Sequence, residues 1–168
     1  MLEHVPRFAQ PGRPDHSRVV VRRPGGDELD VLDPALAASL GDGVRVIKQD
    51  RGVFDAMPLS LITTAGIADL SALVGLELDV QRFRPNLLIE SSEREDAWVG
   101  RTLTIGGMAM RVDQRDERCV IITIDPVTRE RDPSVLRTLA QERDVCIGVY
   151  GSTVRPGSVA LGDAVSLA

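Results

Sequence analysis

The chain has 168 residues and a net charge of −5, and 43% of its residues are hydrophobic. This length suits one domain, or a compact domain with a small appendage, and can bury a sizeable core. The acidic balance argues against general nucleic-acid binding, and no segment has the apolar length of a membrane span. The first residues lack the pattern of a secretion signal, so we expect a cytoplasmic protein.

The predicted elements begin with an arm and include three helices. Residues 1–17 are rich in Pro, Gly and charge, which predicts an irregular arm. Asp33-Pro34 and Asp132-Pro133 each predict a helix start, with Asp as the N-cap and Pro at the first helical position. A third helix is expected from a threonine cap at 63 or 64 to Val74, where Gly75 ends it.

Short runs of β-branched and apolar residues, bounded by Gly and Pro turns, predict about seven strands. The candidate stretches lie at 17–23, 44–49, 81–90, on either side of Gly106-Gly107 within 98–112, at 119–125, 145–150 and in two pieces within 151–167. The strands do not alternate regularly with helices, so a doubly wound parallel sheet is not expected. The pattern favours a mostly β (α+β) fold, a barrel or curled sheet with a few peripheral helices.

The stretch R-D-E-R-C-V-I-I-T-I-D-P, residues 115–126, contains the most informative thiol. If 119–125 is a strand, alternation places a thiol, a hydroxyl and a carboxylate on one face: Cys119, Thr123 and Asp125, with Ile121. The opposite face is purely apolar and is expected to pack on the core: Val120, Ile122 and Ile124. Arg118 precedes the thiol, and positive neighbours favour the reactive thiolate. The alternative is that Cys119 is a small buried hydrophobic residue.

Two further stretches contain arginines that are candidates for binding an anionic ligand. In R-F-R-P-N-L-L-I, residues 82–89, strand alternation puts Arg82, Arg84 and Asn86 on one face, which suits an anionic, hydrogen-bonding ligand. A solvated strand face with surface salt bridges would look the same. In G-V-Y-G-S-T-V-R-P-G, residues 148–157, the glycines allow close approach of a ligand and Arg155 could reach an anion. An ordinary turn between strands is the alternative.

The remaining cysteine and the two histidines argue against several kinds of site. Cys146 lies in an apolar run and is expected to be a buried hydrophobic residue, and a disulfide with Cys119 is not expected. Both histidines lie within the first 16 residues, which argues against a His-rich zinc site and a Ser-His-Asp triad.

Taken together, these three stretches, preceded by P-L-S-L-I-T-T-A-G-I-A-D-L, resemble the MOSC domain, the C-terminal domain of molybdenum cofactor sulfurases. The resemblance implies a MOSC domain over residues 51–168 with a β-barrel-like fold and peripheral helices. Before it would lie the arm, 1–17, and a short N-terminal portion, 18–50, truncated relative to larger relatives. The chain is thus identified as a stand-alone member of the family.

The resemblance also implies a site. In relatives similar to the mitochondrial amidoxime-reducing component, the cysteine that matches Cys119 ligates molybdenum, whereas in cofactor sulfurases it is proposed to carry sulfur. The expected site joins Cys119, as catalytic residue and metal ligand, to cofactor contacts from Arg84, Asn86, Arg118, Thr123, Asp125 and Arg155. Pyridoxal phosphate, which sulfurases use in a separate domain, needs a lysine; Lys48 is the only one, and we reject this cofactor.

Three functions follow as hypotheses. The first is binding of the molybdenum cofactor and reduction of N-hydroxylated compounds, with electrons from a partner protein. The second is a sulfur carrier that takes a persulfide from a cysteine desulfurase. The third is a non-catalytic binding module. Convergence of Cys119, Arg84, Asn86 and Asp125 on one cleft would favour the first two, and a buried Cys119 without a pocket would favour the third.

Overall fold

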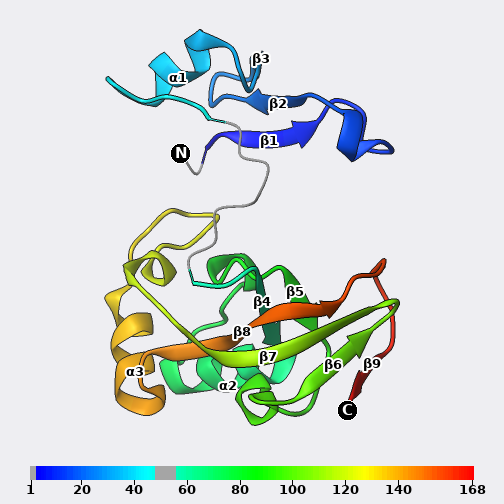
Figure 1. Ribbon diagram of the computed structural model, residues 1–168. Coiled ribbons are helices and arrows are strands. Elements are labelled where there is room, and N and C mark those ends of the chain that lie inside the picture. Colours follow the sequence, from blue (N-terminus) through cyan, green and yellow to red (C-terminus); the bar gives the residue numbers. More distant parts are fainter. Residues whose placement is uncertain (1–2, 48–55) are drawn as a thin grey trace. The chain divides into compact units, whose positions relative to one another are not determined.

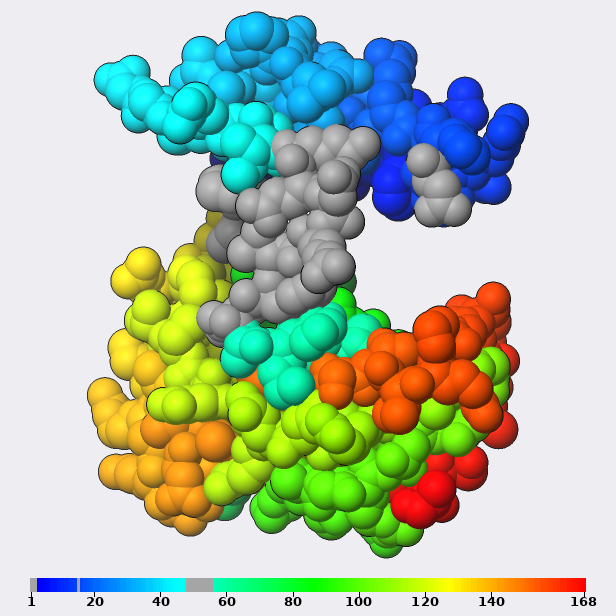
Figure 2. Space-filling view, in the orientation of Figure 1, coloured from blue at the N-terminus to red at the C-terminus, as the bar shows by residue number. Residues whose placement is uncertain are grey.

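The computed structural model describes residues 3–47 and 56–168, which belong to two compact units, 1–51 and 52–168 (Figures 1 and 2). The elements of the first unit are β1 (Val5–Phe8), β2 (Val19–Arg22), β3 (Glu28–Asp30) and α1 (Pro34–Leu40). They form a three-stranded antiparallel sheet in the order β1-β2-β3 with one helix. Val20, Val21 and Leu36 are its buried apolar residues.

Two expectations for the first unit need correction. Residues 1–17 are not an irregular arm, because β1 pairs with β2 along its whole length, with Phe8 opposite Val19. A segment rich in Pro and charge gives no sequence signal for backbone pairing at the edge of a sheet. Residues 44–47 of the strand expected at 44–49 have no regular structure, and the last two residues lie outside the described part of the chain.

The second unit is a six-stranded sheet in the order β5-β4-β8-β7-β6-β9. Its strands are β4 (Leu59–Thr63), β5 (Leu87–Ile89), β6 (Thr102–Ile105), β7 (Met108–Glu117), β8 (Cys146–Arg155) and β9 (Val165–Leu167). Its α-helices are α2 (Thr64–Val74) and α3 (Pro133–Arg143). Only β4 and β5 pair in parallel. Figure 1 shows the strands as one curled sheet with α2 and α3 outside it. The predicted fold class, mostly β with peripheral helices, is confirmed.

The sheet separates two apolar cores. The first core consists mostly of strand residues and includes Leu61, Met110 and Val149. The second core lies where α2 and α3 pack on the sheet, and it includes Ile62, Leu139 and Ile147. Adjacent residues of β4 thus face opposite cores, as alternation requires. In β8, Ile147 and Val149 also face opposite cores although they are two residues apart, because Gly148 between them has φ +85°.

The helix starts form as predicted. The carboxylates of Asp33 and Asp132 accept hydrogen bonds from the backbone N–H groups of Ala35 and Ser134, and the hydroxyl of Thr63 accepts one from Gly66. Each cap satisfies an N–H group that has no partner inside its helix. The hairpin around Gly106-Gly107 also forms, since β6 and β7 pair antiparallel there.

The strand expected at 119–125 is wrong. β7 ends at Glu117, and residues Val120–Thr123 form a 3₁₀ turn. The hydroxyl of Thr123 donates to the carbonyl of Val120, and the N–H of Ile122 donates to the carbonyl of Cys119. The expected faces fail with it, since Val120 is exposed while Ile122 and Thr123 are buried. Local hydrogen bonds outweigh the strand preference of this β-branched run.

The strand expected at 81–90 is also shorter than predicted. Residues Val80–Arg82 form a 3₁₀ turn capped by Asp79, and only Leu87–Ile89 is a strand, β5. Arg84 has φ +53°, so alternation does not apply before β5. At the other end of the chain, the residues after 150 do not begin with a turn, because β8 continues to Arg155. Among the described residues, none of the helices has the length and apolar character that crossing a membrane requires.

Candidate functional site

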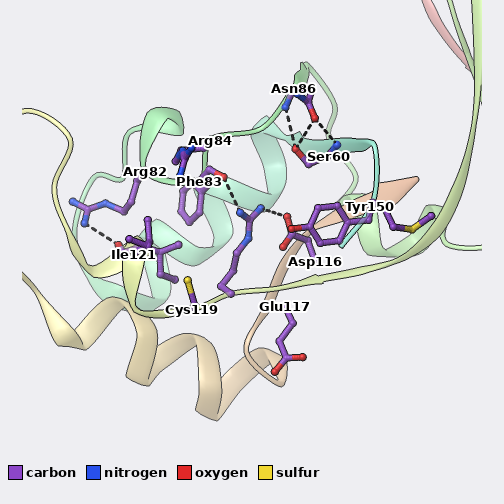
Figure 3. A pocket seen from close by; sticks show the side chains of 13 residues that line it. Ser60, Arg82, Phe83, Arg84, Asn86, Asp116, Glu117, Cys119, Ile121 and Tyr150 are labelled. Carbon is purple, nitrogen blue, oxygen red and sulfur yellow. Dashed lines mark hydrogen bonds and ion pairs between the residues drawn. The ribbon is translucent and has the colours of Figure 1, made fainter. Parts of the chain in front are cut away.

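A cavity of about 270 Å³ lies where β7 ends, and three segments and three single residues line it (Figure 3). They are the loop 82–86, the end of β7 with Cys119 (116–119), the turn residues Ile121 and Ile122, and single residues from elsewhere: Met57, Ser60 and Tyr150. Cys119 is exposed and free, and its backbone is extended, with φ −107° and ψ −176°. The thiol therefore lies at the margin of the cavity and is accessible from solvent.

Arg118, the residue before the thiol, is almost fully buried and makes polar contacts through all three guanidinium nitrogens. Nε donates to the carbonyl of Ile147 at 2.8 Å and Nη1 to the carbonyl of Phe83 at 2.7 Å. Nη2 lies 2.7 Å from Oδ2 of Asp116. The guanidinium carbon is also 5.8 Å from the centre of the Phe83 ring, a cation–π distance. Burial lowers the pKa of Arg118, and the charge of Asp116 opposes that shift.

Gly148 makes room for this arginine. A Cβ at position 148 would lie 2.7 Å from Nη2 of Arg118 and 3.0 Å from the carbonyl oxygen of Leu61. The N–H of Gly148 donates at 2.7 Å to Oε1 of Glu95, a carboxylate that is 2% exposed. The other oxygen of Glu95 accepts from both the N–H and the hydroxyl of Thr63. Glu95 thus joins β8 to the start of α2.

The loop 82–86 contains one buried arginine, which forms an ion pair, and one exposed arginine. Arg82 is buried, donates to the carbonyl of Ile122 at 3.0 Å and pairs with Asp125 at 2.8 Å. Arg84 is exposed, has φ +53° and makes no hydrogen bond or ion pair with any described residue. A non-glycine residue in the left-handed region costs about 1–3 kcal/mol, and such residues cluster at functional sites. Arg84 is therefore the cation of this loop that is available to a ligand.

Asn86 is anchored to β4. Its Oδ1 accepts from the N–H of Ser60 at 2.8 Å and from the Ser60 hydroxyl at 3.1 Å, and its own N–H donates to that hydroxyl. These bonds assign Oδ1 as the acceptor, so the amide nitrogen is the atom left to donate to a ligand.

The structure brings four of the seven predicted site residues to the cavity and leaves three elsewhere. Those that line it are Cys119, Arg84, Asn86 and Arg118. Thr123 is buried with its hydroxyl bonded to Val120, Asp125 reaches the cavity only through Arg82, and Arg155 ends β8 opposite Ala109.

Sequence reasoning missed Asp116, Tyr150, Ser60 and Glu95. A signal existed for Asp116, because residues 116 and 118 share a strand face and have opposite charge. Nothing local marks Glu95, which looks like one more residue of a charged loop. Among residues 3–47 and 56–168, no group of three or more His, Cys, Asp or Glu side chains could hold a metal ion.

The comparisons with known proteins agree with the fold. The MOSC domain family model matches residues 48–166. Mitochondrial amidoxime reducing component 2 of Rattus norvegicus is 32% identical over 128 residues, which are 66% of this chain and 37% of that protein. Molybdenum cofactor sulfurase of Drosophila erecta is 29% identical over 153 residues, which are 82% of this chain and 20% of that protein. The chain thus spans between a fifth and two fifths of these relatives.

A solved structure supports the same conclusion for the fold. YiiM from Geobacillus stearothermophilus superposes with a TM-score of 0.54 over 67% of this chain and 54% of that chain, at 14% sequence identity. The family match covers most of the chain and coincides with the second unit, which holds the sheet, the cavity and Cys119. This chain therefore belongs to the MOSC domain family.

Proposed function

We propose that this protein binds the molybdenum cofactor, with the Cys119 thiolate as the protein ligand of the metal, and reduces N-hydroxylated compounds. The observation that carries the proposal is the exposed, free thiol at the margin of a cavity that also holds Arg84. The names of the relatives, an amidoxime reducing component and a molybdenum cofactor sulfurase, supply the metal and the reaction class. The expected location remains the cytoplasm.

The donor set fits this cofactor at its metal end. A thiolate is a soft ligand that suits molybdenum, and arginine suits the phosphate and oxo groups of the cofactor. The cavity, about 270 Å³, is slightly smaller than most ligand cavities, which hold about 300–1,000 Å³. Within it, Cys119 would hold the metal of the cofactor. When bound, the cofactor would supply the two-electron redox chemistry.

The protein's own residues would bind and orient. Arg84 would contact an anionic group, and its left-handed backbone fixes the direction from which it reaches the cavity. The Asn86 amide nitrogen would donate to a ligand, because Ser60 holds the amide in place. Arg82 and Asp125 would keep the loop and the turn after Cys119 together. An electron-transfer partner would have to supply the electrons.

Metal analysis tests the proposal. We expect the full chain, purified from a host that makes the cofactor, to carry close to one molybdenum per chain. Cys119→Ala should lose it, whereas Cys146→Ala, the matched control, should retain it. Arg84→Gln should weaken retention without abolishing it. Wild type without molybdenum, or Cys119→Ala that retains as much as wild type, would contradict the proposal.

The exposure of the free thiol also favours a second candidate, a sulfur carrier. An exposed thiol suits a persulfide, which a cysteine desulfurase would deliver from outside. This role predicts a mass gain of about 32 Da on Cys119, one sulfur atom, after incubation with a desulfurase and cysteine. An adduct on Cys146 alone, or none, would exclude it.

A further inference from the structure

We propose that Arg118 is a positioning residue, which sets the Cys119 thiol relative to Arg84, and that it does not itself bind the anionic part of a ligand. The inference deepens the proposed function, since it assigns roles within the same site. It replaces the expectation from sequence that Arg118 contacts the cofactor.

The first argument is that each of the three guanidinium nitrogens already contacts a protein oxygen. Its three nitrogens contact the carbonyl of Ile147, the carbonyl of Phe83 and the carboxylate of Asp116, all at 2.7–2.8 Å. These partners belong to three separate segments, β8, the loop 82–86 and β7. Arginine suits such a role because its donors form a rigid planar fork. These contacts hold the guanidinium in place, and the Arg118 side chain is only 10% exposed, so little of it faces a ligand.

The second argument is where those contacts lie along the chain. Arg118 directly precedes Cys119, and its own N–H donates to the carbonyl of Val145 at 2.9 Å. Phe83, whose carbonyl it holds, directly precedes Arg84. One side chain therefore fixes the backbone next to the thiol and the backbone next to the available cation. Moving the guanidinium would change the distance between those two groups.

The third argument concerns charge. The side chain of Asp116 is 1% exposed and lies against Arg118, so the pair presents little net charge to the cavity. Arg84 is exposed and has no ion-pair partner among the described residues. The positive potential that an anion meets beside Cys119 should therefore come from Arg84.

Alkylation of Cys119 separates the two roles in the full chain without cofactor. Iodoacetamide is neutral and iodoacetate is an anion, so the ratio of their rates, iodoacetate over iodoacetamide, reports positive potential at the thiol. A Cys146→Ser background restricts the reaction to Cys119. Arg84→Gln should lower the ratio by about twofold in low-salt buffer, because it removes one unscreened positive charge from the same cavity.

The variant that tests Arg118 is the pair Arg118→Gln with Asp116→Asn, because it deletes both charges together. We expect its rate ratio to equal that of the parent, while both individual rates move toward those of the urea-unfolded chain. Arg118→Lys, which keeps an ion pair with Asp116 but not the two carbonyl bonds, should show the same shift if the double variant folds poorly. Fluorescence of Trp98, the only tryptophan, verifies folding.

Two results would overturn the inference. A fall of the ratio in the double variant as large as in Arg84→Gln would make Arg118 an anion contact. Unchanged rates for both reagents would leave Arg118 with a purely structural role. Neither result depends on molybdenum, so failure of the metal analysis and failure of this inference are distinguishable.

Discussion

Replacing Gly148 by alanine should destabilise the second unit by about 2–5 kcal/mol. Two costs combine. An alanine at φ +85° adopts the left-handed region, which costs roughly 1–2 kcal/mol. In addition, its Cβ would lie 3.0 Å from the backbone oxygen of Leu61, which cannot easily move, and 2.7 Å from Nη2 of Arg118. Overpacking of this kind costs about 1–3 kcal/mol.

Gly75→Ala separates the two costs. Gly75 ends α2 with φ +77°, and a Cβ there would meet nothing within 4 Å. The control therefore carries the conformational cost alone, about 1–2 kcal/mol. The difference between the two variants measures the steric term at Gly148.

Urea titration followed by Trp98 fluorescence is the assay, since Trp98 is 4% exposed in the core of this unit. A Gly148→Ala variant that is no less stable than Gly75→Ala would refute the reasoning. It would mean that β8 accommodates the methyl group without displacing Arg118.

Arg82→Met should lower the free energy of unfolding by about 2–3 kcal/mol, because it removes a 6%-exposed partner from the pair with Asp125. Arg111→Met, in an exposed pair, should cost less than about 1 kcal/mol in the same urea titration, and equal losses would contradict this ranking. Hydrogen bonds from backbone N–H groups, that of Thr128 first, lower the pKa of Asp125. The stability that this carboxylate contributes is therefore present above its unfolded pKa, about 3.9, and is lost as pH falls through the lower folded pKa. Urea midpoints between about pH 5 and pH 2 should fall less steeply for Asp125→Asn than for wild type; parallel curves would exclude a role for Asp125.

Local chemistry made the helices predictable. Asp33 and Asp132 each precede a proline and cap the helix that follows, and both signals act within three residues. The hairpin at Gly106-Gly107 was equally readable, because its turn and its alternation are local. The fold class followed from counting such elements.

The interior of the site was not predictable in the same way. Residues 119–125 have the composition of a strand, and what stops them is partly a contact from Arg82, which binds the carbonyl of Ile122 from 40 positions away. The sequence shows the charge of Arg118, but the carbonyl groups that accept its hydrogen bonds belong to Phe83 and Ile147, on two other segments. A sequence pattern shows which groups exist, whereas their partners depend on how distant segments pack.

The end of the β7–β8 pair also has a consequence for local opening. The backbone bond from Arg118 to Val145 is formed, and Cys119 follows it outside both strands. Amides within the two ten-residue strands should exchange with solvent only on global unfolding, whereas those of the short turn at Val120–Thr123 should exchange through small fluctuations. The thiol thus sits at the border between a slowly and a rapidly exchanging region. A ligand that binds Cys119 should therefore slow amide exchange in the turn Val120–Thr123 and leave exchange in β7 and β8 unchanged.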